Sequence, residues 1–173
     1  MRPATMVSAI IIVTAMAAVS SQMGGSAKAD IYNIRGEKIG TATLSQVPDG
    51  VRIGLEVSKL SPGMHGIHIH AVGKCDPPDF STAGPHLNPQ SKKHGLQNPE
   101  GPHAGDMKNL TVGADGTAHI EFADTLVSLA EDVPNSLFHP KGTAIVIHAD
   151  PDDEMTDPSG KSGARIACGV ISK

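Results

Sequence analysis

The chain has 173 residues, long enough for one domain with a substantial core. It carries 14 basic and 18 acidic side chains, which gives a formal net charge of −4. This acidic balance excludes the basic surface of a typical nucleic-acid-binding protein, so we expect no nucleic-acid partner.

Residues 1–29 have the features of a secretory signal peptide. Arg2 supplies a short positive region, an apolar run follows over residues 6–19, and Ala27-x-Ala29 is the small-residue pattern of a signal-peptidase site. The run is too short and its flanks are too polar for a typical membrane span. An uncleaved membrane anchor is the alternative interpretation.

Cleavage would leave a mature domain over residues 30–173 with no membrane span. Residues 1–29 hold two basic and no acidic side chains, so the mature formal charge would be −6. We therefore expect an exported protein, either periplasmic or secreted.

The first strands predicted in the mature chain form a β-hairpin over residues 41–57. The run "TATLSQV" is followed by the turn Pro48-Asp49-Gly50 and then by "VRIGLEV", in which apolar and polar residues alternate. This period of two predicts a half-buried antiparallel strand. Its inward side chains would be Val51, Ile53, Leu55 and Val57.

Further runs along the chain also favour strands. Residues 109–112 and 117–122 are predicted to form a second hairpin around Asp115-Gly116. "TAIVIHA" and "RIACGVI" predict two more strands, and no stretch has a sustained helical period. The sum is an all-β sandwich or barrel of about seven or eight short strands.

One segment, from Gly73 to Lys108, has no strand pattern and is rich in Gly, Pro, Asp, Asn and His. A compact domain seldom contains so long a loop unless the loop is functional or cross-linked. Cys75 lies in it, and the one other cysteine is Cys168. Export to an oxidising compartment favours a disulfide between them, with two free buried thiols as the alternative.

The stretch "GMHGIHIH" concentrates three histidines just before this loop. Because side chains alternate along a strand, His68 and His70 share one face while Ile67 and Ile69 point into apolar packing. Two imidazoles on one face of a rigid strand predict a bidentate metal site. His65 has the opposite parity, so we expect a structural histidine rather than a ligand.

The long loop and a later strand supply further metal-binding side chains, namely His86, His94, His103, Asp106 and His148. Histidine and aspartate without thiolate suit Zn(II) or Cu(II) rather than Cu(I) or an iron–sulfur cluster. The two remaining histidines are expected on the solvent face of a strand (His119) and in a turn (His139).

Six stretches in this order resemble the copper–zinc superoxide dismutases of the bacterial secreted type: "GMHGIHIH", "AGPHLNP", "KKHG", "HAGD", "IVIHADPDD" and "ARIACGV". The resemblance implies an eight-stranded antiparallel Greek-key β-sandwich or barrel with a long metal-binding loop and a shorter charged loop. It also implies the disproportionation of the superoxide anion to dioxygen and hydrogen peroxide, by alternate reduction and oxidation of a histidine-bound copper beside a bridged structural zinc. One copper and one zinc per chain are expected. Both monomers and homodimers are compatible with this type.

The resemblance assigns roles to individual residues of this sequence. It implies copper ligands His68, His70, His86 and His148, and zinc ligands His86, His94, His103 and Asp106. Asp152 would hydrogen-bond His68 and His94, Arg165 would guide the anion to the copper, and His86 would also transfer a proton. Cys75 and Cys168 would form the family disulfide.

Other functions remain as alternatives at this point. A copper-chaperone or scaffold relative is disfavoured because all the implied ligands are present and no Cys-x-x-Cys occurs, and a metal store because it would need no arginine beside the copper. A zinc hydrolase is disfavoured because no carboxylate is evidently placed as a base, and a copper-only dismutase because all the implied zinc ligands are retained. The other acidic residues of the 150–157 segment, and Lys161, are expected to be solvated loop side chains.

Overall fold

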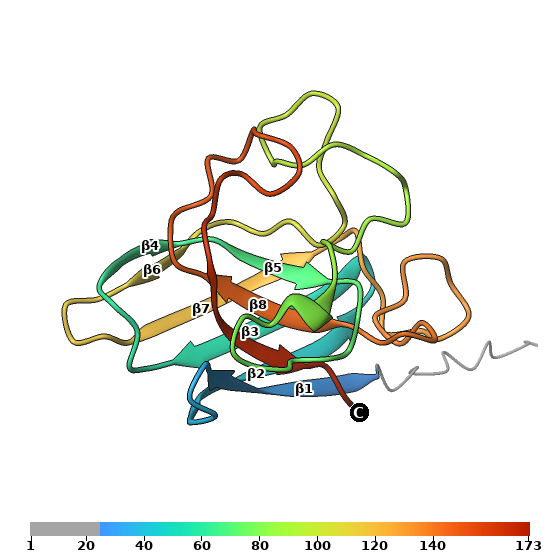
Figure 1. Ribbon diagram of the computed structural model, residues 1–173. Coiled ribbons are helices and arrows are strands. Elements are labelled where there is room, and N and C mark those ends of the chain that lie inside the picture. The colour runs from blue at the N-terminus through green and yellow to red at the C-terminus, as the bar shows by residue number, and fades with distance from the viewer. Residues whose placement is uncertain (1–24) are drawn as a thin grey trace, which may run out of the picture.

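The computed structural model describes residues 25–173, which form a curved antiparallel sheet with loops above one edge (Figure 1). Within these residues the strands are β1 (Ser26–Asn33), β2 (Lys38–Val47), β3 (Gly50–Val57), β4 (Gly63–His65), β5 (Ile67–His70), β6 (Leu110–Val112), β7 (Ala118–Asp124), β8 (Ala144–His148) and β9 (Arg165–Val170). A single 3-10 turn, η1, spans Ser81–Ala83. No helix in this part of the chain is long and apolar enough to cross a membrane.

Seven strands form the main sheet in the order β5-β8-β9-β1-β2-β3-β7, and β4 pairs with β6. The first strand lies beside the last, and β3 lies beside β7, so long connections cross between non-consecutive strands as in Greek-key folds. The predicted all-β barrel-like class is confirmed. The described chain has nine strands: the stretch "GMHGIHIH" is divided at Gly66 into β4 and β5, and β1 is a strand that the sequence patterns did not predict.

The predicted hairpin of β2 and β3 is confirmed, with a register that runs from Gly40↔Val57 to Val47↔Gly50. The alternating apolar residues of β3 are buried in the main core. Gly50 closes the turn at φ 145°, and a Cβ there would lie 2.1 Å from the carbonyl oxygen of Asp124. The turn therefore requires glycine.

The second predicted hairpin is wrong in its pairing. The reversal is present, since the Gly113 N–H donates to the Thr117 carbonyl at 2.8 Å. However, β6 pairs with β4, and β7 pairs with β3. The local turn determines only the change of direction, whereas the partner of each strand follows from long-range burial of its apolar face.

The predicted domain boundary at residue 30 falls inside β1. Ser26–Ala29 pair with β2 from Ser26↔Ser45 to Ala29↔Ala42, and the side chains of Ala27 and Ala29 are buried. The folded domain therefore includes these residues, and residues 25–173 carry 13 basic and 18 acidic side chains. The apolar run over residues 6–19 lies outside the described residues, so the signal peptide stays a prediction.

The predicted disulfide joins Cys75 and Cys168, whose Cα atoms lie 5.7 Å apart. It ties the beginning of the long loop to β9, where Phe80 packs with Cys168 in a small apolar cluster. The long loop and the segment between β8 and β9 rise together above β5 and β8 (Figure 1). These two loops and the strands beneath them enclose the histidines.

Candidate metal centre

Strand β5 holds the first two histidines, and it is buried along its whole length. It pairs with β8 in the register His68↔Val146. On its other edge, Ile69 donates to Gly105 O and accepts from Leu87 N, both at 2.8 Å, so the long loop is hydrogen-bonded to the strand. A Cβ on Gly105 would lie 2.1 Å from Ile69 O, and this close approach therefore depends on glycine.

His65 has the structural role that its parity predicts. Its ring is buried, with Nδ1 2.8 Å from the carbonyl oxygen of His148 and Nε2 2.9 Å from that of Ser61. Both ring nitrogens are therefore engaged by backbone, and His65 fixes the end of β8 rather than offering a ligand.

Besides His139 Nε2, four buried ring nitrogens have no hydrogen-bond partner within the described chain, although buried polar atoms are normally paired. They are His68 Nδ1, His70 Nε2, His86 Nε2 and His148 Nε2. Ligand atoms of these four residues lie within 4.8 Å of one another. Unpaired ring nitrogens that converge in this way can act as ligands, and they fit a metal ion bound by four imidazoles.

A second group of ligand atoms converges on one oxygen of Asp106. Asp106 Oδ1 lies 2.8 Å from His86 Nδ1, 3.0 Å from His94 Nδ1 and 3.4 Å from His103 Nδ1. The other oxygen, Oδ2, accepts the backbone N–H groups of Gly95 and His103 at 2.8 and 2.9 Å. This leaves Oδ1 free to face the three rings, and a tetrahedral zinc fits such a donor set.

Asp152 connects the two groups of ligand atoms by contacting one histidine of each. Its carboxylate lies 2.5 Å from His68 Nε2 and 3.0 Å from His94 Nε2. Its own backbone is fixed by Asn109, whose amide donates to Asp152 O at 2.8 Å and accepts from Asp152 N at 2.7 Å. This role of Asn109 could not be predicted from the sequence, because nothing in the local pattern connects it to a residue 43 positions away.

A family model described as copper/zinc superoxide dismutase (SODC) matches residues 38–171. The chain belongs to the copper/zinc superoxide dismutase family. It is 54% identical over 144 residues to superoxide dismutase (Cu-Zn) 1 of Aquifex aeolicus (strain VF5), covering 83% of this chain and 85% of that one. It is 44% identical over 139 residues to superoxide dismutase (Cu-Zn) of Caulobacter vibrioides (strain ATCC 19089 / CIP 103742 / CB 15), covering 79% of each chain.

Solved structures show the same relationship. A SOD-like protein from Bacillus subtilis superposes with a TM-score of 0.80 at 38% identity, covering 83% of this chain and 96% of that one. The Cu/Zn superoxide dismutase from Brucella abortus superposes with a TM-score of 0.70 at 28% identity, covering 86% and 100%. The protein is an oxidoreductase that disproportionates superoxide with copper and zinc as cofactors.

The protonation of the rings in the dismutase follows from their surroundings. Burial and the charges of neighbouring histidines together lower the pKa of His86 to about 4 and that of His148 to about 3, although hydrogen bonds to Asp106 and to Gly163 O oppose the change. Burial also lowers the pKa of His70 well below its ordinary value. These rings are neutral at pH 7, which is the form of imidazole that binds a metal.

His94 behaves differently from the other rings. Burial alone would lower its pKa, but hydrogen bonds to Asp106 and Asp152 outweigh this effect and raise the pKa to about 9. For the carboxylates of Asp106 and Asp152, burial acts in the opposite direction and raises the pKa. The hydrogen bonds from the histidines outweigh burial and hold both pKa values well below the usual range. Metal binding at His94 must therefore release a proton.

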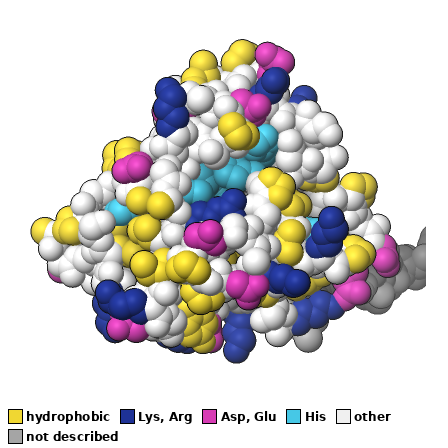
Figure 2. All heavy atoms as spheres, in the orientation of Figure 1, with side chains coloured by type: hydrophobic (Ala, Val, Ile, Leu, Met, Phe, Trp, Pro, Cys, Tyr) yellow, Lys and Arg dark blue, Asp and Glu magenta, His cyan; other side chains and the backbone are white. Residues whose placement is uncertain are grey.

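Arg165 is the cross-strand partner of His148 in the pairing of β9 with β8. Its guanidinium donates from Nη1 to Phe80 O and from Nη2 to Gly84 O, both at 2.8 Å. The Gly84 carbonyl also lies 2.8 Å from His70 Nδ1. One backbone oxygen therefore positions both the arginine and a histidine of the first group. Figure 2 shows histidine side chains in a hollow of this face, with basic and acidic side chains at its edge.

The structure brings together every predicted site residue. It adds the carbonyl oxygens of Phe80, Gly84 and Gly163, the last of which lies 3.3 Å from His148 Nδ1. Backbone oxygens carry no residue-type signal, so sequence patterns could not reveal them. His119 is exposed as predicted, and its Nδ1 lies 3.5 Å from Glu56 Oε1.

Proposed function

We propose that the four unpaired nitrogens bind copper, through His68, His70, His86 and His148. The observation that carries this assignment is their convergence in a buried and otherwise unsatisfied group. Bound copper supplies the change of valence that two one-electron steps require, which zinc cannot supply.

The zinc is assigned to His86, His94, His103 and Asp106. Ligand atoms of a tetrahedral zinc with bonds of about 2.0–2.1 Å lie about 3.3 Å apart. The separations of 2.8–3.4 Å around Asp106 Oδ1 approach this value. Atoms of His68, His86, His94 and Asp106 also meet within 4.8 Å. However, His68 has no nitrogen left for the zinc, because its Nε2 contacts Asp152 and its Nδ1 belongs to the copper group. His103 is therefore the better fourth ligand.

His86 is the ring shared by the two groups. Its Nδ1 faces Asp106 and its Nε2 belongs to the unpaired set. Nε2 is thus the atom on which His86 can hold a proton and pass it to the reduced substrate. The second nitrogen remains fixed on the zinc side, so the ring keeps its orientation while the proton moves.

Arg165 is proposed to attract and orient superoxide beside the copper. The substrate is an anion, whereas residues 25–173 carry five more acidic than basic side chains. A local cation is therefore needed for favourable encounter. Burial lowers the pKa of Arg165 from its usual value, with Asp79 opposing this change, and arginine keeps its charge in proteins.

We propose that the protein is exported to the periplasm or to the outside of the cell. The Cys75–Cys168 disulfide supports it, because such bonds persist in oxidising compartments. Since Ser26–Ala29 belong to β1, we expect the signal to be removed before Ser26 rather than after Ala29. The amino-terminal sequence of the exported protein tests both statements.

Metal content and dismutase activity of selected variants test the site assignment. Wild type should contain one copper and one zinc per chain and show cyanide-sensitive activity. His70→Ala should lose copper and activity but keep zinc, whereas His103→Ala should lose zinc first. Zinc without activity after copper loading of the wild type would overturn the assignment and leave a metal store as the alternative.

A further inference from the structure

The histidines proposed as ligands share a second feature on the side that faces away from the metals. His86 gives one nitrogen to each metal group. Every other ligand ring has an outer nitrogen that is not offered to a metal, and a hydrogen bond from this nitrogen to a fixed acceptor sets the orientation of the ring. Four of these rings make such a bond: His68 and His94 to Asp152, His70 to Gly84 O, and His148 to Gly163 O.

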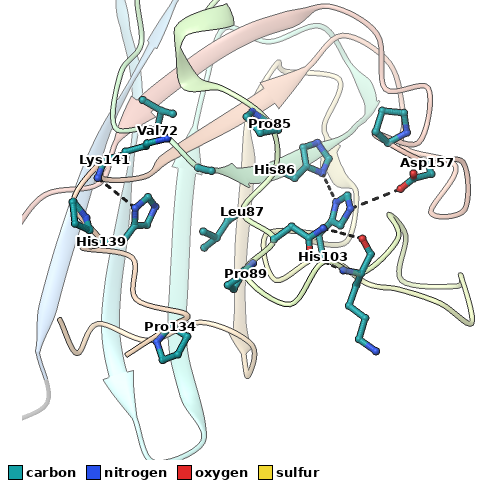
Figure 3. Close-up of a pocket in the computed structure, with 15 residues that line it drawn as sticks. Val72, Pro85, His86, Leu87, Pro89, His103, Pro134, His139, Lys141 and Asp157 are labelled. Atoms are coloured by element: carbon teal, nitrogen blue, oxygen red, sulfur yellow. Dashed lines mark hydrogen bonds and ion pairs between the residues drawn. The ribbon is translucent and has the colours of Figure 1, made fainter. Parts of the chain in front are cut away.

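His103 completes this pattern through a residue of the other loop. Its Nδ1 lies 3.4 Å from Asp106 Oδ1 and 3.4 Å from His86 Nδ1, so this nitrogen faces the zinc group. Its outer nitrogen, Nε2, faces Asp157 Oδ1 at 3.8 Å, a longer separation than the hydrogen bonds of the other four rings (Figure 3). His103 and Asp157 line the same surface cavity.

The same carboxylate oxygen also contacts a second histidine of the zinc group. Asp157 Oδ1 accepts the backbone N–H of His94 at 2.7 Å. The chain just after His94 is held to the same loop, because Gln97 N donates to Glu154 O at 3.0 Å. Asp157 thus lies where the acidic loop meets two neighbouring zinc-side residues, rather than being only a solvated side chain.

We propose that Asp157 is a positioning residue of the zinc site. An imidazole that offers Nδ1 to a metal carries its proton on Nε2, and the Asp157 carboxylate faces that N–H. It selects this tautomer of His103, and it fixes the backbone of His94. A carboxylate behind a ligand histidine also makes the ring a stronger donor. The proposal rests on the zinc ligand set assigned above.

A purely mechanical role for Asp157 makes a different prediction. If the side chain only tethers the loop through His94, Asp157→Asn preserves the function, because an amide oxygen still accepts the N–H. If the charge orients His103, Asp157→Asn fails and Asp157→Glu recovers part of the loss. Asp153→Asn is the matched control, since that carboxylate carries the same charge but bonds within its own loop, to Met155 N at 3.0 Å and Thr156 N at 2.7 Å.

The test is the release of zinc from the copper- and zinc-loaded protein to a chromophoric chelator at pH 7, together with copper content. Asp157→Asn should weaken zinc binding about tenfold and Asp157→Ala further, within the range of about 10- to 100-fold for groups behind ligands. Asp153→Asn should stay within about twofold of wild type, and copper content should not change. Wild-type zinc binding in Asp157→Asn would overturn the proposal. Unchanged zinc binding in His103→Ala would instead show that the ligand set is wrong.

Discussion

Asp124 provides a test of how burial changes the stability of this enzyme with pH. It ends β7 and is only 8% exposed. Its Oδ1 accepts the N–H of Leu126 at 2.8 Å, whereas its Oδ2 has no partner within residues 25–173. Burial, together with the charge of Asp106, raises the pKa of this carboxyl from 3.8 to about 6, although the hydrogen bond from Leu126 opposes the rise.

The sign of the effect follows from which state loses its proton first. Between pH 4 and 6 the unfolded chain releases the proton of Asp124 while the folded protein still holds it, so stability falls as the pH rises through this window. The shift of about two units, at about 1.36 kcal/mol each, corresponds to a cost of about 3 kcal/mol for the ionised carboxylate at neutral pH. Asp124→Asn keeps the acceptor for Leu126 and cannot ionise.

We therefore expect Asp124→Asn to be more stable than wild type by about 3 kcal/mol at pH 7 and nearly equal to it at pH 4. The assay is denaturant unfolding of the metal-free, disulfide-intact protein across this range. The metal histidines are common to both proteins, so their titration cancels in the difference. Glu121→Gln, on the exposed side of β7, controls for net charge. A difference between Asp124→Asn and wild type that is the same at pH 4 and pH 7 would refute the reasoning.

Three further predictions concern the site and the disulfide. His148→Ala should lose copper and activity while zinc content and fold persist, and an equal loss of zinc in metal analysis would contradict its role. Cys75→Ser opens a crosslink across 93 residues, and unfolding should show a loss of about 4–5 kcal/mol less any relief of strain. Arg165→Ala should lower kcat/KM about 10- to 100-fold at full copper loading, as expected for one charge-assisted contact. Arg165→Lys should recover part of this loss and Arg165→Glu should be worse, so equal rates for all three variants would exclude guidance by the charge.

Local chemistry in the sequence was sufficient to predict the central hairpin and the face shared by His68 and His70. Both follow from the period of two along a strand, which assigns each side chain to a face without reference to any partner. The types of the remaining ligands limited the metal to Zn(II) or Cu(II), because imidazole and carboxylate without thiolate suit these ions. The order of the motifs then identified the family.

Only the tertiary structure decided which atoms meet. The pairing of β7 with β3, and the place of Ala29 in the sheet, depend on apolar faces brought together from distant parts of the chain. The Gly84 carbonyl and the Asp157 carboxylate acquire their roles in the same way, since the ring of His103 lies 54 positions from the carboxylate that faces it. Alternation along a strand is a property of neighbouring residues, whereas contacts between loops depend on the path of the whole backbone, and no spacing in the sequence records that path.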